Sequence, residues 1–139
     1  MDLLGPAGKS VVIQLANRVK FVLRPITTMA TYEQVKDVPN HPEVYLIDVR
    51  RKEELEQTGC IPASINIPLD ELDKALNLDA AAFKNKYARS KPEKDSKIIF
   101  SCRSGNRVLE AEKIAKGLGF CNVVIYKGSW NEWAQKEGL

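Results

Sequence analysis

The sequence predicts an α/β fold in which a parallel sheet carries helices on both of its faces. Short apolar runs alternate along the chain with segments of helical periodicity, and polar loops separate them. Strands that alternate with helices favour a parallel sheet, because each crossover helix covers a sheet face. A length of 139 residues, with 44% hydrophobic and 28% charged residues, is that of one globular domain with its own core.

The first predicted helix begins at a capping box, because Thr31 is followed three residues later by Gln34. Asp79 is placed to cap another helix, and residues 89–96 form a charged loop that contains proline. The elements expected are, in order, helix 32–38, strand 44–48, helix 51–57, strand 64–66, helix 69–76, helix 80–86, strand 97–101, helix 108–116, strand 123–126 and a last helix from residue 129.

Residues 1–28 are expected to form a basic amphipathic extension to a domain that spans residues 29–139. Residues 1–32 hold four of the 21 basic and one of the 18 acidic residues, so the remainder carries 17 of each. Apolar residues recur there at helical spacing, namely Val12, Leu15, Val19, Leu23 and Ile26. This pattern is typical of a mitochondrial transit peptide. A packed extra helix and a shorter form beginning at Met29 are the alternatives, so a mitochondrial and a cytoplasmic location both stay open.

Composition excludes several classes of function. The balanced charge after residue 32 gives no footprint for nucleic acid, and no apolar run approaches the roughly 18 residues of a membrane span. Cys60, Cys102 and Cys121 lack the Cys-x-x-Cys spacing of a zinc site or redox pair. No metal or cofactor is therefore indicated. An odd cysteine count without a secretory signal favours a reducing, intracellular compartment, and Cys121 is expected to be a buried, inert thiol.

The segment 102–107, Cys-Arg-Ser-Gly-Asn-Arg, is the most informative part of the chain. It joins a predicted buried strand to the start of a predicted helix, and in open α/β sheets sites lie at the carboxyl ends of the strands. The amides of the loop and of the helix start favour a negative charge. Arg103 and Arg107 add two cations, so Cys102 is expected to be a thiolate nucleophile.

Two observations narrow the chemistry of Cys102. The one histidine, His41, lies in a loop rich in proline, and nothing in the sequence brings it to Cys102 as a proteolytic dyad would require. Cysteine phosphatases close their cradle with Cys-x5-Arg, whereas this loop is Cys-x4-Arg and has Val108 at the sixth position. The shorter loop favours transfer of a single sulfur atom over transfer of a phosphoryl group.

The segment 102–107 resembles the active-site loop of the single-domain rhodaneses, which are thiosulfate sulfurtransferases. The resemblance covers residues 29–139. Three further segments carry it: residues 44–50, which contain an Asp-x-Arg signature; residues 53–54 together with 59–68, which match one block of the family; and residues 126–133. It implies a rhodanese-like fold. Three positions depart from the family pattern: Cys60 replaces a usual His, Ala63 a frequent Gly and Ser129 a usual second Gly. Cys60 and Ala63 fall in a structural turn and leave the loop untouched, whereas Ser129 is expected to change packing near the loop, and none of the three puts Cys102 in doubt.

The resemblance implies that Cys102 takes the outer sulfur of thiosulfate as a persulfide and passes it to cyanide, glutathione or thioredoxin. The substrate-binding set is then Arg103, Ser104, Gly105, Asn106, Arg107 and Arg50. Arg50 either attracts the anionic donor or pairs with Glu53 or Glu54, and Asp48 is expected to bind loop amides as a structural residue. Trp130 and Trp133 are expected to pack in the core or at its rim, and the protein is expected to be a monomer.

Other functions remain as alternatives to thiosulfate transfer. One is a stress-associated binding module that uses the cradle to recognise an anion or persulfide without catalysis. A cysteine phosphatase and a sulfurtransferase that uses mercaptopyruvate are less favoured, the first because of the loop length. The mercaptopyruvate branch typically has Gly after the cysteine and lacks the paired arginines. Turnover with a sulfur donor discriminates catalysis from binding.

Overall fold

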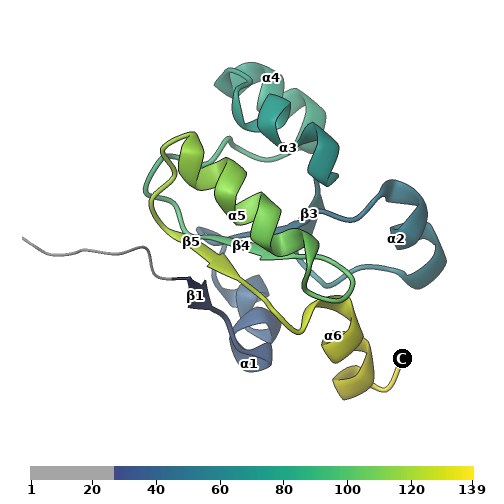
Figure 1. Cartoon of the computed structure of the whole chain (residues 1–139). Helices are drawn as coiled ribbons and strands as arrows, with labels where there is room; N and C mark the ends of the chain where they lie inside the picture. Colours follow the sequence, from purple (N-terminus) through teal and green to yellow (C-terminus); the bar gives the residue numbers. More distant parts are fainter. Residues whose placement is uncertain (1–26) are drawn as a thin grey trace, which may run out of the picture.

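The computed structural model describes residues 27–139, so the helix expected within residues 12–26 lies outside them. The described chain alternates strands with helices (Figure 1). Its elements are β1 (Thr28–Met29), α1 (Tyr32–Lys36), the 3₁₀ helix η1 (Val38–Asn40), β2 (Tyr45–Asp48), α2 (Lys52–Thr58), β3 (Ser64–Asn66), α3 (Leu69–Leu76), α4 (Ala80–Tyr87), β4 (Ile98–Ser101), α5 (Arg107–Gly117), β5 (Val123–Ile125) and α6 (Ser129–Glu137).

The five strands form one sheet in the order β1-β5-β4-β2-β3, and every neighbouring pair is parallel. All carboxyl ends therefore meet at one edge of the sheet. The three inner strands, β5, β4 and β2, are buried along their whole length, and they are apolar except for Asp48 and Ser101 at the carboxyl ends of β2 and β4. The predicted fold class, a parallel sheet with helices on both faces, is confirmed.

Each face of the sheet has its own apolar core, because side chains alternate along a strand. In β2, Ile47 points into the core beneath α3, α4 and α5, and Leu46 points into the core shared with α1 and α6. Figure 1 shows these two groups of helices on opposite faces of the sheet. Trp130 and Trp133 belong to the second core, as expected.

Local signals set several helix ends. The predicted capping box is present at α1, where Thr31 accepts from the amide of Gln34 and the Gln34 side chain accepts from the amide of Thr31. Asp79 caps α4 through the amide of Ala82, again as expected. The bounds of α3 and the start of α6 are as predicted, and the other helix bounds differ from the predicted ones by at most two residues.

Three features differ from the expectations or were absent from them. Strand β1 and the 3₁₀ helix η1 were not predicted. Cys121 is exposed, so the prediction of a buried thiol is wrong. Its neighbour Phe120 fills the core instead, while the amide of Cys121 is held by the carbonyl of Lys94 at 2.9 Å. Within residues 27–139, no helix is both long and apolar enough to cross a bilayer.

Candidate active site

Cys102 lies at the carboxyl-terminal edge of the sheet, directly after β4. The register pairs Asp48 of β2 with Ser101 of β4, and the amide of Val49 donates to the carbonyl of Ser101 at 2.8 Å. Two loops therefore leave the centre of the sheet side by side, one through Asp48 and Val49 and the other through Cys102. This is the edge where ligands bind in open α/β sheets.

The sulfur of Cys102 lies at the bottom of its loop, with a residue exposure of 1%. The amide of Gly105 donates to Sγ at 3.1 Å, which is the contact expected of a loop that folds back over a thiolate. The hydroxyl of Ser129 lies 3.6 Å from the same sulfur. That hydroxyl donates to the carbonyl of Tyr126 at 2.8 Å and accepts from the amide of Cys102 at 3.0 Å.

Three carbonyls of the loop accept hydrogen bonds from the first turn of α6 and from Lys127, which precedes it. Trp130 donates its amide to the carbonyl of Cys102 at 2.9 Å, and Asn131 donates to that of Arg103 at 3.0 Å. The ammonium of Lys127 binds the carbonyl of Gly105 at 2.9 Å. In a trans peptide the C=O and the following N–H point in opposite directions. Each tied carbonyl therefore turns the next amide toward the front of the loop.

Those next amides are the ones of Arg103, Ser104 and Asn106. None of the three has a hydrogen-bond acceptor among residues 27–139. Three free amides around one buried sulfur form a concave site for an anion. The side chains of Ser104 and Asn106 are exposed, and the side chain of Asn106 does not cap α5. Backbone rather than side-chain groups thus form the cradle.

Gly105 is required by the geometry of this loop. Its φ is +91°, in the region that favours glycine, and a Cβ added there would lie 2.1 Å from the carbonyl oxygen of Lys127. No side chain fits in that space without displacing backbone. The loop therefore requires a glycine at position 105 for steric reasons.

Arg107, the last residue of the loop, is held by a carboxylate from α2. Glu54 accepts from both of its terminal nitrogens, at 2.7 and 3.0 Å. These bonds hold the pKa of Glu54 at about 2, well below its ordinary value of 4.5, and raise the pKa of Arg107. A guanidinium nitrogen of Arg103 lies 3.9 Å from the same carboxylate. Glu54 therefore balances the two loop cations.

Arg50 and Asp48 form a buried pair beside the loop, with exposures of 0% and 1%. The guanidinium donates to both Asp48 oxygens and to the carbonyl of Gly59, and its carbon lies 5.0 Å from the centre of the Trp130 ring. Asp48 also accepts from the amide of Arg50 at 3.0 Å, so its expected bond to a loop amide is present. Of the two alternatives for Arg50, pairing with Glu53 or Glu54 is wrong, because Asp48 takes that place.

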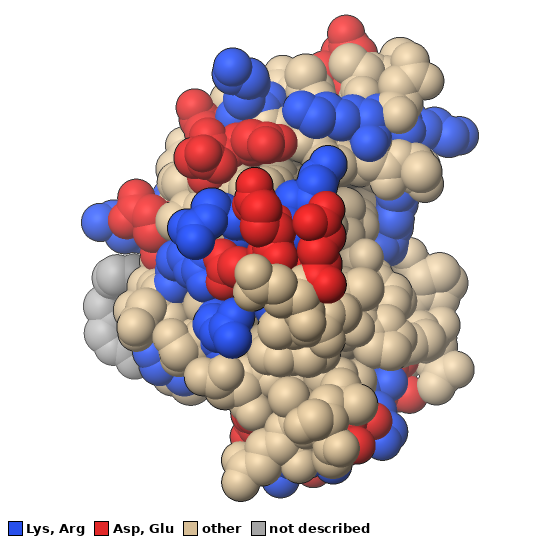
Figure 2. Space-filling model, turned by 90° about the vertical axis from the view of Figure 1, so that its right-hand side faces the viewer, with Lys and Arg blue, Asp and Glu red and all other residues tan. Residues whose placement is uncertain are grey.

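The surface around α2 carries charged side chains of both signs. Figure 2 shows basic and acidic groups lying side by side over the middle of the face that carries α2. His41 lies directly after η1, where Asp37 binds its ring at 2.8 Å and raises its pKa, in agreement with its predicted place in a loop.

Sequence reasoning missed three residues that contact the loop. Glu54 holds Arg107, Lys127 holds the carbonyl of Gly105, and Ser129 contacts the sulfur. They lie 22 to 53 positions away from their partners in the chain. The available signal was their place in the segments 53–54 and 126–133, which are the segments that carry the family resemblance.

Comparisons with known proteins identify the family of this chain. The family profile described as a Rhodanese-like domain matches residues 31–136. Rhodanese domain-containing protein CG4456 of Drosophila melanogaster is 88% identical over 111 residues, which cover 80% of this chain and all of that protein. Human thiosulfate:glutathione sulfurtransferase is 41% identical over 93 residues, covering 66% of this chain and 80% of the relative.

A third relative has a solved structure. The mitochondrial thiosulfate sulfurtransferase RDL2 of Saccharomyces cerevisiae is 37% identical over 123 residues, covering 84% of this chain and 82% of that protein. Its crystal structure, described as a single domain sulfurtransferase, matches with a TM-score of 0.71 over 84% of this chain and 95% of the solved chain. The profile match, the three relatives and the shared fold together show that this chain belongs to the rhodanese-like family of single-domain sulfurtransferases.

Proposed function

We propose that the protein is a thiosulfate sulfurtransferase that works by double displacement through a persulfide on Cys102. In the first step the Cys102 thiolate attacks the outer sulfur of thiosulfate. A new S–S bond forms between Sγ and that sulfur, while the bond to the sulfonate sulfur breaks. Sulfite leaves with the electron pair, so no proton transfer is required. This agrees with a loop that has no histidine beside the nucleophile among its described contacts.

The cradle stabilises the charge that moves in this step. The amides of Arg103, Ser104 and Asn106 are free to bind the transferred sulfur or a sulfonate oxygen. They cost little reorganisation, because α6 and Lys127 fix their peptides. The guanidinium groups of Arg103 and Arg107 would attract the sulfonate. Arg50 is buried and fully bonded, so we assign it to positioning the loop rather than to contact with the donor.

In the second step a thiophilic acceptor removes the outer sulfur and restores the thiolate. Cyanide is the smallest acceptor and gives thiocyanate, whereas glutathione and thioredoxin are the proposed cellular partners. Glutathione is supported by the human relative that is named for it. No cofactor or metal takes part in either step of the proposed reaction.

The observation that carries the proposal is the short contact between the Gly105 amide and Sγ inside a ring of free amides. The test is thiosulfate-dependent formation of thiocyanate, with the intact mass recorded after thiosulfate alone. We expect turnover and a mass gain of one sulfur atom, both lost in Cys102→Ser and both kept in the exposed-thiol control Cys121→Ser. A protein that gains no sulfur and shows no turnover would contradict the proposal and favour a non-catalytic binding module.

The compartment depends on residues 1–28, which lie almost entirely outside the described chain. Their basic, amphipathic sequence supports a mitochondrial location, in line with the yeast relative named as mitochondrial. A cytoplasmic location follows if the segment does not act as a signal. A fluorescent reporter fused to residues 1–28, compared with one in which Arg18, Lys20 and Arg24 are replaced by glutamine, decides between the two.

A further inference from the structure

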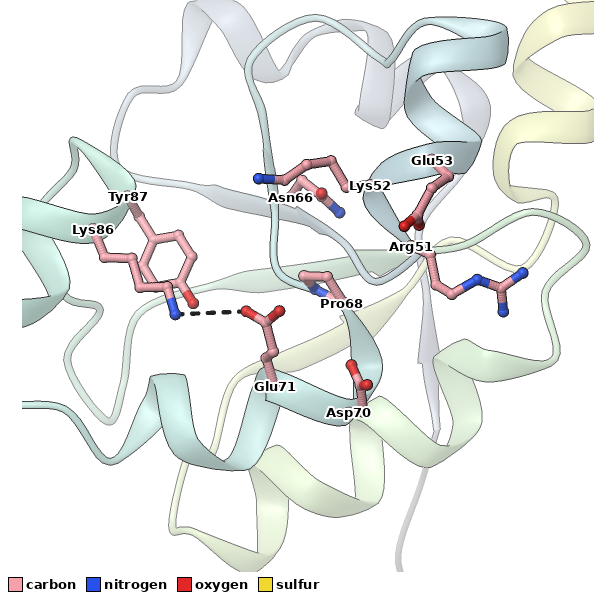
Figure 3. Close-up of a pocket in the computed structure, with 9 residues that line it drawn as sticks. All are labelled: Arg51, Lys52, Glu53, Asn66, Pro68, Asp70, Glu71, Lys86 and Tyr87. Atoms are coloured by element: carbon pink, nitrogen blue, oxygen red, sulfur yellow. Dashed lines mark ion pairs between the residues drawn. The ribbon is translucent and has the colours of Figure 1, made fainter.

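The loop 102–107 has different surroundings on its two sides. A cavity of about 570 Å³ lies between α2, α3 and α4 (Figure 3). None of the residues that line this cavity belongs to the loop, so the cavity is separate from the cradle. The side of the loop that faces α6 is closely held, because three loop carbonyls are bonded there. Groups that act on the sulfur through the loop are therefore found on the α6 side.

The three bonds to the loop carbonyls differ in the group that donates. Trp130 and Asn131 donate through their backbone amides, which any residue except proline provides. The carbonyl of Gly105 is bound instead by the side chain of Lys127, whose Nζ lies 2.9 Å from the oxygen. Of the three bonds, this one depends on the identity of a side chain. A substitution can therefore remove it and leave the backbone contacts in place.

Lys127 contacts Gly105 with its backbone and with its side chain. A Cβ added to Gly105 would lie 2.1 Å from the carbonyl oxygen of Lys127 and 3.2 Å from its Cδ. The side chain of Lys127 thus runs along the face of Gly105 before the ammonium reaches the carbonyl. The amide of Gly105 in turn donates to Sγ of Cys102 at 3.1 Å. A single residue of the loop therefore joins Lys127 to the nucleophile.

The bond from Lys127 also orients the next peptide group. The C=O and the following N–H of a trans peptide point in opposite directions. A Gly105 carbonyl that is held toward Lys127 thus turns the amide of Asn106 toward the front of the loop. This amide has no acceptor among residues 27–139. A cation bound to the carbonyl also polarises the peptide group, which makes its N–H a stronger donor.

The charge of Lys127 is not offset by an acid in the described part of the chain. Its ammonium has no carboxylate within ion-pair distance there, although the residue is exposed. The two arginines of the loop differ, because both lie near the carboxylate of Glu54. Lys127 therefore adds a positive charge to the loop from the side opposite to α2.

Sulfur transfer changes which atom carries the negative charge of the enzyme. Before the first proposed step this charge is on Sγ, which the amide of Gly105 binds. After sulfite has left with the electron pair of the broken S–S bond, the charge lies on the outer sulfur of the persulfide. That sulfur lies farther out, toward the front of the loop, where the amide of Asn106 points. An N–H that binds the charge only after it has moved lowers the barrier to transfer.

We propose that Lys127 is a positioning residue for sulfur transfer, which acts through Gly105 by holding the amide of Asn106 toward the outer sulfur of the persulfide. The inference rests on the proposed function and adds a residue to the same site. Lys127 acts on the loop, whereas the guanidinium of Arg107 attracts the donor. Loss of Lys127 therefore slows the loading of sulfur at saturating thiosulfate, and it changes the thiosulfate requirement little.

The test uses two neutral variants, one rescue variant and one control. Lys127→Met and Lys127→Gln remove the charge, whereas Lys127→Arg keeps a cation that can donate to the Gly105 carbonyl. Lys113→Met is the matched control, because Lys113 is an exposed lysine of α5. Urea unfolding checks that every variant is folded under the assay conditions.

Rapid-quench mass spectrometry gives the limiting rate of sulfur loading and the thiosulfate concentration at half that rate. We expect the limiting rate to fall about fivefold in both neutral variants, because each loses one charge-assisted hydrogen bond at a partly exposed site. The concentration at half rate should change by less than about twofold. Lys127→Arg should restore most of the rate, and Lys113→Met should equal the wild type.

A second measurement does not depend on a rate. Loading is reversible, so a fixed ratio of thiosulfate to sulfite sets the fraction of protein that carries the extra sulfur. A weaker hold on the outer sulfur lowers this equilibrium constant. We expect it to fall about fivefold in Lys127→Met and Lys127→Gln, and to keep its wild-type value in Lys113→Met.

Three outcomes would overturn the inference. Equal rates and equal loading in Lys127→Met and the wild type would remove Lys127 from the mechanism and leave the persulfide chemistry intact. A higher thiosulfate requirement with an unchanged limiting rate would make Lys127 a cation that attracts the donor and not a positioning residue. A wild-type protein that takes up no sulfur would instead defeat the proposed function, and this inference with it.

Discussion

Glu54 and Arg107 join α2 to the catalytic loop through two hydrogen bonds of 2.7 and 3.0 Å. The side chain of Glu54 is 13% exposed and that of Arg107 is 31% exposed, so the pair is partly shielded from water. A bidentate pair fixes the plane of the guanidinium as well as its position. The cation at the end of the loop is therefore held in place before any substrate arrives.

The first prediction concerns acid stability. Arg107 holds the pKa of Glu54 at about 2 in the folded protein, against an ordinary value of 4.5. A carboxylate with a lowered pKa contributes stability that is fully present above pH 4.5 and is lost as the pH falls toward 2. Glu54→Gln should lower the free energy of unfolding at pH 7 by about 1 kcal/mol, given the partial exposure of the pair.

The same variant should lose less stability than the wild type between pH 4.5 and pH 2. Urea unfolding at a series of pH values measures both effects. Glu53→Gln is the matched control, because Glu53 is an exposed neighbour on α2. Parallel pH profiles for Glu54→Gln and the wild type would show that the pair does not contribute.

The second prediction concerns donor binding. Arg107→Ala removes a cation from the cradle, so the KM for thiosulfate should rise about tenfold. The kcat at saturating thiosulfate should fall by a smaller factor than the KM rises. Arg103→Ala should have a smaller effect, since Arg103 is 46% exposed and lies farther from Glu54. Initial rates at varied thiosulfate and fixed cyanide measure both. Unchanged kinetics in Arg107→Ala would remove this arginine from the mechanism.

The third prediction concerns the buried pair of Asp48 and Arg50. Arg50→Met leaves the Asp48 carboxylate buried without its cation, which should cost about 3–5 kcal/mol of stability. The double variant Asp48→Asn with Arg50→Met removes both charges and should recover part of that loss. Thermal or urea unfolding of the two variants checks this. Equal losses in both would mean that the unpaired charge is not the cause.

The fourth prediction concerns Ser129, whose φ of +54° strains any side chain. Its hydroxyl is the acceptor for the buried amide of Cys102, so Ser129→Ala keeps the strain and orphans that amide, at a cost of about 1–3 kcal/mol. Ser129→Gly also loses the hydroxyl but relieves the strain, so it should be the more stable of the two. If urea unfolding shows that Ser129→Ala is the more stable of the two, the backbone strain at residue 129 does not limit stability.

Much of the fold could be predicted because its signals are local. Strands β2 and β4 are apolar runs between polar residues, and α1 and α4 begin at recognisable caps. Strand β1 has only two residues and exists through its pairing with β5, which no local pattern reveals. The wrong prediction for Cys121 has a similar origin. Its position just before a strand suggested burial, but Phe120 occupies the core at that turn.

The candidate site was predictable only in its own segment. A cysteine between a buried strand and a helix start indicates a nucleophile with backbone amides around it, and the loop has this form. The contacts that orient the loop come from α2, from Lys127 and from the first turn of α6. Such long-range partners depend on the packed fold, and a single sequence shows periodicity and spacing but not which distant side chains meet.

The last prediction concerns the glycine of the loop. In Gly105→Ala a Cβ would lie 2.1 Å from the carbonyl oxygen of Lys127, at a φ of +91°, so the loop must shift away from the sulfur. We expect a loss of about 2–4 kcal/mol in stability and at least a tenfold fall in kcat/KM for thiosulfate.

Gly117→Ala is the matched control, because it lies at the end of α5 with no atom within 4 Å of the added carbon. Its stability should be unchanged or slightly higher, since alanine favours a helix over glycine by about 1 kcal/mol. Urea unfolding and thiosulfate kinetics on both variants check the pair. A wild-type rate in Gly105→Ala would show that the contact between the amide of residue 105 and Sγ is not needed for sulfur transfer.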